Sequence, residues 1–171
     1  MDRVTLGRRI GERCRLTGAF TLRSGQTSTN YFDKYLFESN PAMLGEVAAY
    51  AATVVPAGVE VLAGLELGGV PVATALSLAT GIPAAFVRKE AKRYGTAKLA
   101  EGCAIEGRRV LVVEDVITTG GQVAQSTRAL RDRGAEVDSV LCIIDRSGGA
   151  HPELDSIDCS VIALFTSDQL G

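Results

Sequence analysis

Tryptophan is absent from this chain, and aromatic residues of all kinds make up only 5% of its 171 residues. Large aromatic side chains therefore do not dominate its core, although apolar residues reach 46% of the composition. A core built mainly from Val, Leu, Ile and Ala suits helices layered against a sheet. The length is enough for one domain with a sizeable core and too short for two independent ones.

Cysteine and histidine are also scarce. The four cysteines lie far apart with no CxxC pair, which excludes a dense disulfide scaffold and indicates reduced thiols. His151 is the single histidine and stands beside Pro152 in a polar stretch. We therefore expect His151 to be a surface residue and expect no zinc site.

No charge of one sign dominates, since 18 basic residues oppose 20 acidic ones and the formal net charge is −2. This balance excludes a broad attraction to nucleic acid or to an anionic membrane, so any anion site must be local. No apolar run approaches the roughly 20 residues that cross a bilayer, and the N-terminus lacks the apolar region of a secretory signal. We expect a cytoplasmic protein with no nucleic-acid or membrane partner.

Beyond residue 40, apolar runs of strand length alternate with helical spacing, which predicts an α/β fold with parallel strands and ligands at their carboxyl ends. Residues 19–37 are predicted to form short antiparallel strands or an ordered loop, and residues 88–102 a long loop. The predicted helices cover about 2–16, 41–55, 71–80 and 121–133, and the predicted strands 59–63, 84–87, 109–115, 137–144 and 160–165.

The strongest chemical signal lies between Val110 and Gly121, where a buried strand ends in Glu114 and Asp115 and a Thr-Thr-Gly-Gly turn leads into a helix. Backbone N–H groups of residues 118–122, helped by the helix dipole, suit a dianionic phosphate, and the glycines permit close approach. The two carboxylates can accept hydrogen bonds from sugar hydroxyls or act through magnesium-bound water. The alternative is an ordinary strand that ends in solubilising acids and is followed by a helix cap. It explains the segment less well, because one acid would serve as well as two and the Thr-Thr-Gly-Gly run exceeds what capping requires.

This segment resembles the 5-phosphoribosyl 1-diphosphate (PRPP) motif of the type I phosphoribosyltransferases: four apolar residues, two acids, two further positions, then hydroxyl residues and glycine. The resemblance implies a mostly parallel five-stranded sheet flanked by helices, in a single domain with a small N-terminal hood (about 1–40) over a core (about 41–171). It also implies Mg²⁺ held mainly through the substrate, and PRPP contacts from Glu114, Asp115, Val116, Ile117, Thr118, Thr119, Gly120, Gly121 and Gln122.

The basic run at residues 88–95 looks like the catalytic loop of orotate phosphoribosyltransferases, which in that family closes over the diphosphate and is shared across a dimer. A solvated charged loop is the plainer reading, but its place between two strands and ahead of the acidic motif favours the loop of the family. Cations that arrive on closure stabilise the transition state more than the open ground state. The resemblance implies catalytic roles for Arg88, Lys89, Lys92 and Asp115, and a PRPP contact from Tyr94, where the family usually has histidine.

The segment from Phe20 to Asp33 resembles the N-terminal hood of the same family. Arg23 stands there for the usual lysine that contacts PRPP. Tyr31 and Phe32 match an aromatic pair that packs near the orotate ring, although a place in a small core suits them equally.

Two further positions bear on substrate recognition. Arg146 matches an arginine that pairs with the orotate carboxylate, a task suited to a planar guanidinium, and Thr118 lies where orotate is also held. Gly68 stands where many members of the family carry a lysine.

The sequence thus predicts a member of the orotate phosphoribosyltransferase family over about residues 16–149. Such an enzyme is a magnesium-dependent pentosyltransferase that joins orotate to PRPP, giving orotidine 5′-monophosphate and diphosphate in pyrimidine biosynthesis. The resemblance also implies a homodimer that shares loop 88–102 across its interface. A phosphoribosyltransferase for another base, or a non-catalytic regulator that senses PRPP, are the alternatives.

Overall fold

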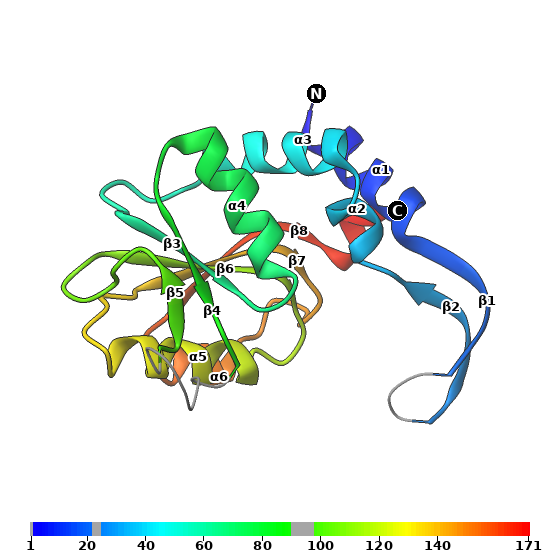
Figure 1. The fold of residues 1–171 in the computed structure, drawn as a ribbon. Helices are drawn as coiled ribbons and strands as arrows, with labels where there is room; N and C mark the ends of the chain where they lie inside the picture. Colours follow the sequence, from blue (N-terminus) through cyan, green and yellow to red (C-terminus); the bar gives the residue numbers. More distant parts are fainter. Residues whose placement is uncertain (1, 22–24, 90–97) are drawn as a thin grey trace.

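A central sheet organises the chain in the computed structural model, which describes residues 2–21, 25–89 and 98–171. Within these residues the sheet has six strands in the order β5-β4-β3-β6-β7-β8 (Figure 1). Neighbouring strands are parallel, except that β5 pairs antiparallel with β4 at one edge. The strands are β3 (Val61–Leu65), β4 (Ala84–Val87), β5 (Ala100–Gly102), β6 (Val110–Ile117), β7 (Ser139–Asp145) and β8 (Ser160–Thr166).

The five parallel strands agree with the predicted sheet, and β5 is the addition. It lies inside the segment predicted as a loop, because three residues, Ala-Glu-Gly, carry no alternation of apolar side chains that sequence reasoning can detect. Its place comes instead from backbone pairing with the edge of β4.

Helices cover both faces of this sheet. Residues of α1, α3 and α4 pack in one apolar cluster with Leu62, Leu111 and Leu141, whereas residues of α5 and α6 pack in a second cluster with the alternate strand positions, among them Val112 and Val140. Figure 1 shows α3 and α4 on one side of the sheet and α5 and α6 on the other. The helices are α1 (Arg3–Cys14), α2 (Tyr35–Glu38), α3 (Pro41–Ala52), α4 (Gly69–Thr80), α5 (Gly121–Arg131), α6 (Pro152–Asp155) and the 3₁₀ helix η1 (Ser167–Leu170).

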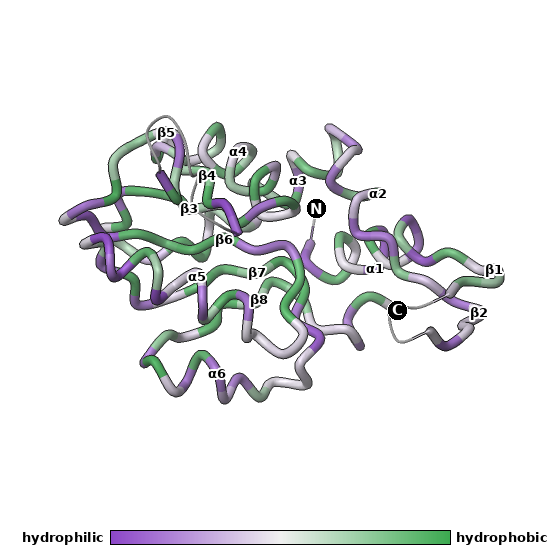
Figure 2. Tube along the Cα trace, turned by 60° about the horizontal axis from the view of Figure 1, so that its bottom comes forward, coloured by the Kyte–Doolittle hydropathy of each residue, from purple (hydrophilic) through white to green (hydrophobic). Residues whose placement is uncertain are grey.

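Burial on both faces explains why the central strands read as continuous apolar runs rather than alternating ones. Every residue of β3 is buried, and so are the first four residues of β6. In Figure 2 the strands of the sheet are green over much of their length. No helix among the described residues is long and apolar enough to span a membrane.

The N-terminal part forms a hairpin that extends away from the sheet (Figure 1). Strands β1 (Arg15–Thr21) and β2 (Thr27–Phe32) pair antiparallel, so the first of the two structures predicted for residues 19–37 is present. Helix α1 ends at Cys14, two residues before the predicted end, because β1 begins at Arg15. The Asp33 N–H donates to the Cys14 carbonyl at 2.8 Å and closes the base of the hairpin.

Close packing of α1 on η1 generates a stability prediction. A Cβ atom at Gly11 would lie 1.7 Å from the Leu170 carbonyl oxygen, which is backbone and cannot rotate away, whereas a Cβ at the exposed helical Gly45 would meet nothing within 4 Å. Gly11→Ala should lower the free energy of unfolding by about 1–3 kcal/mol. Gly45→Ala should raise it by about 0.5–1 kcal/mol. Urea denaturation measures both, and equal stability of the two variants would contradict the packing described.

Candidate functional site

A cavity of about 270 Å³ opens at the carboxyl end of β6, and we call it the β6 cavity. It brings together many of the residues that the sequence analysis assigned to PRPP. They come from the end of β6, from the turn after it and from the start of the charged loop (residues 88–102). It also contains Lys34, which the sequence analysis did not single out. The lining residues are Lys34, Tyr35, Glu66, Leu67, Lys89, Glu114, Val116, Ile117, Thr118, Thr119, Gly120, Gln122 and Val123.

The turn between β6 and α5 has the geometry of an anion site. Gly120 has φ 78°, a left-handed conformation that favours glycine, and no side chain caps the helix that begins at Gly121. The first N–H groups of a helix have no partner within the helix, so here they are available to a ligand. A Cβ at Gly120 would lie 3.4 Å from the side chain of Leu154, so α6 supports the turn from behind.

The two acids near the end of β6 differ in their exposure to the cavity. Glu114 lines the β6 cavity, whereas the Asp115 side chain is fully buried and does not line it. One Asp115 oxygen, Oδ1, accepts the Val116 N–H at 2.8 Å. The other, Oδ2, lies 2.5 Å from Lys34 Nζ. The side chain of Asp115 therefore acts on the cavity through Lys34.

Glu38 on α2 adds a third carboxyl group to this cluster, although sequence reasoning gave no sign of it. It is buried, and neither of its oxygens meets a hydrogen-bond donor within the described part of the chain. Burial and then the neighbouring Asp115 raise the pKa of Glu38 to about 9, and the same causes raise the pKa of Glu114 to about 9. At neutral pH both therefore hold a proton that they can share with Asp115.

Asp115 itself is the ionised member of the cluster. Burial acts to raise its pKa, but hydrogen bonds from Glu114, Glu38 and Lys34 outweigh burial and leave the pKa below its usual value. Burial likewise acts against the charge of Lys34, and the Asp115 carboxylate more than restores it, so the pKa of Lys34 is raised. The cluster thus holds two protonated acids and one ion pair, whose Asp115 carboxylate is buried and whose Lys34 side chain is 32% exposed. This arrangement avoids an uncompensated buried charge.

The same cluster explains Gly68. A Cβ at this position would lie 1.9 Å from Asp115 Oδ2 and 2.3 Å from its Cγ, so no side chain fits there while Asp115 faces Lys34. The ammonium group that many family members carry at this loop has no room here. Lys34 brings an ammonium group to the same carboxylate.

The charged segment that follows β4 is described only at its ends. Lys89 lines the β6 cavity, and its N–H donates to Glu66 Oε1 at 2.5 Å. Arg88 instead lies 3.5 Å from Glu101 of β5 and lines a neighbouring cavity. Lys92, Tyr94 and Arg23, which the sequence analysis assigned to PRPP, lie outside the described residues.

A second cavity, of about 170 Å³, lies at the end of β7, and we call it the β7 cavity. Two of the residues predicted to hold orotate, Phe32 and Arg146, meet in it. Tyr31 does not, because it lies on the other face of β2, where it is 45% exposed and stacks on Phe20 at 5.5 Å between ring centroids. The lining residues are Arg15, Phe32, Ile144, Arg146, Ser167 and Leu170.

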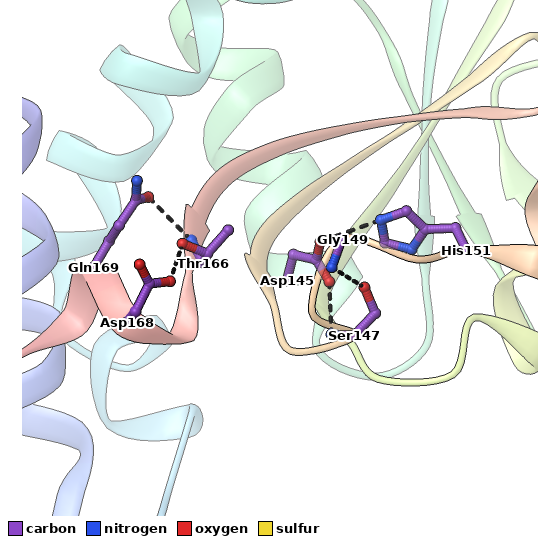
Figure 3. Close-up of polar contacts among 7 residues, drawn as sticks. All are labelled: Asp145, Ser147, Gly149, His151, Thr166, Asp168 and Gln169. Atoms are coloured by element: carbon purple, nitrogen blue, oxygen red, sulfur yellow. Dashed lines mark hydrogen bonds and ion pairs between the residues drawn. The ribbon is translucent and has the colours of Figure 1, made fainter.

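The two cavities lie at the ends of adjacent strands, β6 and β7. The Arg146 N–H donates to the Ile117 carbonyl at 2.8 Å, which places Arg146 next to the turn that carries Thr118. Helix η1 contributes Ser167 and Leu170 to the β7 cavity. Thr166 holds the start of this helix, because its hydroxyl donates to Asp168 and its N–H donates to Gln169 (Figure 3). Throughout residues 2–21, 25–89 and 98–171, no side chain pairs with the Arg146 guanidinium.

His151 corrects an expectation of the sequence analysis. Its side chain is 12% exposed rather than on the surface, and its Nε2 lies 3.1 Å from Asp145 Oδ2 (Figure 3). Pro152 begins α6, and Leu154 of that helix is fully buried, so α6 draws His151 against the end of β7. The described residues contain no group of three or more His, Cys, Asp or Glu residues that could hold a metal.

Comparison with known proteins decides which family the chain belongs to. Residues 37–166 match the family model for the phosphoribosyl transferase domain. The chain is also 60% identical over 153 residues to an orotate phosphoribosyltransferase of Nocardioides sp., covering 89% of this chain and 86% of the relative. The chain belongs to the orotate phosphoribosyltransferase family. It is a pentosyltransferase of pyrimidine biosynthesis, and the family and reaction predicted from the sequence are confirmed.

Solved structures of orotate phosphoribosyltransferases share the fold. The Mycobacterium tuberculosis enzyme in complex with Fe(III) dicitrate is 33% identical, with a TM-score of 0.85 over 100% of this chain and 99% of that one. The same enzyme in complex with PRPP is 31% identical, with a TM-score of 0.80 over the same shares of the two chains. The predicted fold class, a mostly parallel sheet between helices with a small N-terminal hood, is thus confirmed.

The buried acids generate a prediction for this orotate phosphoribosyltransferase in magnesium-free buffer. The folded chain keeps a proton on Glu38 up to about pH 9, whereas the unfolded chain releases it near the ordinary pKa of 4.5. The stability that this proton provides is therefore complete below that ordinary pKa and is lost as the pH rises toward 9. Its slope is at most about 1.4 kcal/mol per pH unit for each such group.

Glu38→Gln keeps a hydrogen-bond donor to Asp115 and removes one titrating group. Thermal melting between pH 6 and 9 should show the wild-type Tm falling with pH and the variant Tm falling less steeply. Glu153→Gln, at an exposed position of α6, is the matched control and should keep the wild-type slope. Equal slopes for the wild type and Glu38→Gln would show that Glu38 is ionised in the folded protein.

Proposed function

We propose that this orotate phosphoribosyltransferase binds PRPP in the β6 cavity and orotate in the β7 cavity, at the carboxyl edge of β6 and β7. The meeting of Lys34, Lys89, Glu114 and the turn of residues 118–122 around one cavity carries the proposal. Ammonium groups, a carboxyl group and unpaired backbone N–H groups are the partners that a diphosphate, a ribose and a phosphate require. We also propose that the hood and the core act as a single domain.

The turn of residues 118–122 holds the 5-phosphate through its N–H groups, and Glu114 faces the ribose hydroxyls. When Mg²⁺ is bound, mainly through the substrate, it would neutralise diphosphate charge and so make diphosphate a better leaving group. Glu114 is the one acid of the β6 pair that faces the cavity, so it is the residue that can reach the metal through water. Asp115 has both oxygens engaged and contributes by positioning Lys34.

The departing diphosphate interacts with the basic side chains of the site. Lys89 and Lys34 already line the cavity, and Lys92, Arg88 and Tyr94 complete its surroundings as the charged loop closes. Arg88 then leaves its contact with Glu101 and pairs with the diphosphate. Arg23 of the hood contacts PRPP from the other side. Cations gathered in this way stabilise the negative charge that develops as the bond breaks.

The reaction breaks the bond between C1 of the ribose and the diphosphate oxygen, which keeps the bonding electrons, and forms the bond from C1 to N1 of orotate, whose N1 proton passes to the departing diphosphate. Because the leaving group itself accepts this proton, the step depends mainly on alignment and charge stabilisation. Arg146 pairs with the orotate carboxylate, Phe32 packs against the flat ring, and Thr118 holds the side toward the ribose. Tyr31, on the other face of β2, contacts orotate only with a change of the hairpin.

We propose further that the enzyme is a cytoplasmic homodimer in which loop 88–102 of one protomer closes over the site of its partner. The absence of an overall basic charge supports small-molecule substrates rather than nucleic acid.

The choice of base tests the function directly. In a diphosphate-release assay with PRPP and magnesium, the enzyme should turn over orotate, and adenine, xanthine and uracil at least about 100-fold less efficiently, because none of these bases offers Arg146 a carboxylate. Equal or better turnover of a purine would overturn the substrate. Binding of PRPP without turnover of any base would instead indicate a regulator.

Lys89 tests the mechanism. Lys89→Ala should lower kcat by about 100-fold or more and change the KM of PRPP much less, because its ammonium group acts on charge that appears in the transition state. Lys98→Ala, an exposed lysine at the other end of the loop, is the control and should leave kcat unchanged. Steady-state kinetics measure both, and equal effects of Lys89→Ala on kcat and on PRPP binding would count against loop closure as the catalytic step.

Lys92→Ala tests the shared loop, because Lys89 lines the cavity of its own chain. Mixing Lys92→Ala with Arg146→Ala should restore part of the activity, since a mixed dimer that shares the loop holds one site with neither substitution. Failure to restore activity despite verified subunit exchange would show that each site is complete within one chain.

A further inference from the structure

Residues 145–151 form a closed loop around one carboxylate. Asp145 ends β7 and is 4% exposed. Its Oδ1 accepts the Ser147 N–H at 2.8 Å, and its Oδ2 lies 3.1 Å from His151 Nε2. Between these contacts the Ser147 hydroxyl accepts the Gly149 N–H at 3.1 Å (Figure 3). The loop therefore begins and ends on the two oxygens of the same side chain.

Both ends of this loop are anchored to the core. At the start, the Arg146 N–H donates to the Ile117 carbonyl of β6. At the end, the His151 carbonyl accepts N–H groups from Leu154 and Asp155 at 2.9 and 2.8 Å, which fixes His151 to the first turn of α6. Leu154 is fully buried and lies against Gly120 of the turn between β6 and α5. The backbone of His151 is thus held in place by α6.

The pairing matters because of the residue beside Asp145. Arg146 follows it in the chain, is exposed, and lines the β7 cavity. A buried carboxylate with a free oxygen attracts the nearest cation, since leaving it uncompensated is costly. Here the Ser147 N–H and the His151 imidazole occupy both oxygens. Asp145 is therefore satisfied without Arg146, and the Arg146 guanidinium is left for a ligand.

We infer that His151 is a positioning residue for carboxylate recognition: it holds Asp145, and so keeps the Arg146 guanidinium unpaired and directed into the β7 cavity. The inference rests on the proposed pairing of Arg146 with the orotate carboxylate. His151 touches no substrate. It acts through Asp145 on the loop that carries Arg146.

Two substitutions of similar size separate the hydrogen bond from mere bulk. His151→Leu fills the space without a donor, whereas His151→Gln places an amide N–H near the position of Nε2. With wild-type enzyme turning over orotate, His151→Leu should raise the KM of orotate about tenfold and change kcat and the KM of PRPP by less than about twofold. His151→Gln should restore the KM of orotate to within about threefold of wild type. Equal increases in both KM values, or no rescue by glutamine, would overturn the inference.

The same variants in an Arg146→Ala background show whether His151 acts through Arg146. Arg146→Ala alone should raise the KM of orotate, and adding His151→Leu should raise it no further, because residues that act as a unit are not additive. An additive effect would mean that His151 acts elsewhere and would overturn the inference alone. If Arg146→Ala leaves the KM of orotate unchanged, the proposed pairing of Arg146 with orotate fails, whatever His151 does.

Discussion

The ion pair between half-buried Lys34 and fully buried Asp115 is the contact on which the site depends. It joins the residue that follows the hairpin to the end of the central strand β6, at a distance of 2.5 Å. Because Asp115 points into the interior to meet Lys34, Glu114 faces the β6 cavity, and position 68 has room only for glycine. One pairing thus sets the direction of both acids and the chemistry of the neighbouring loop.

Burying such a pair is favourable only when the remaining lone pairs and protons are also satisfied. Glu38 and Glu114, with pKa values raised to about 9, meet this need by sharing protons with Asp115. The cluster is therefore close to neutral although it contains three carboxyl groups. A neutral interior behind the cavity leaves Lys89 and the N–H groups of residues 118–122 to face an anionic substrate without competition from a buried negative charge.

Much of this arrangement was predictable from local sequence. The apolar runs located the five parallel strands, and the acids followed by Thr-Thr-Gly-Gly located the turn, because both signals lie within one continuous segment. Arg146 and Phe32, predicted as orotate residues, do meet in one cavity, whereas Tyr31 follows the alternation of β2 to the other face.

What escaped prediction depends on contacts between distant segments. Lys34 and Glu38 reach Asp115 across about 80 residues of chain, and β5 exists only through its pairing with β4. His151 follows Asp145 by only six residues, but it looked like a surface residue because the turn that brings the two together is set by the packing of α6. In each case the side chain or strand is placed by tertiary contacts, which the pattern of neighbouring residues does not reveal.

A crystal structure of the enzyme with PRPP and magnesium tests the central claim most directly. The account predicts the 5-phosphate within hydrogen-bond distance of the N–H groups of residues 118–122, with the ammonium groups of Lys34 and Lys89 toward the diphosphate. PRPP bound away from the β6 cavity, or a diphosphate that neither ammonium group approaches, would contradict it.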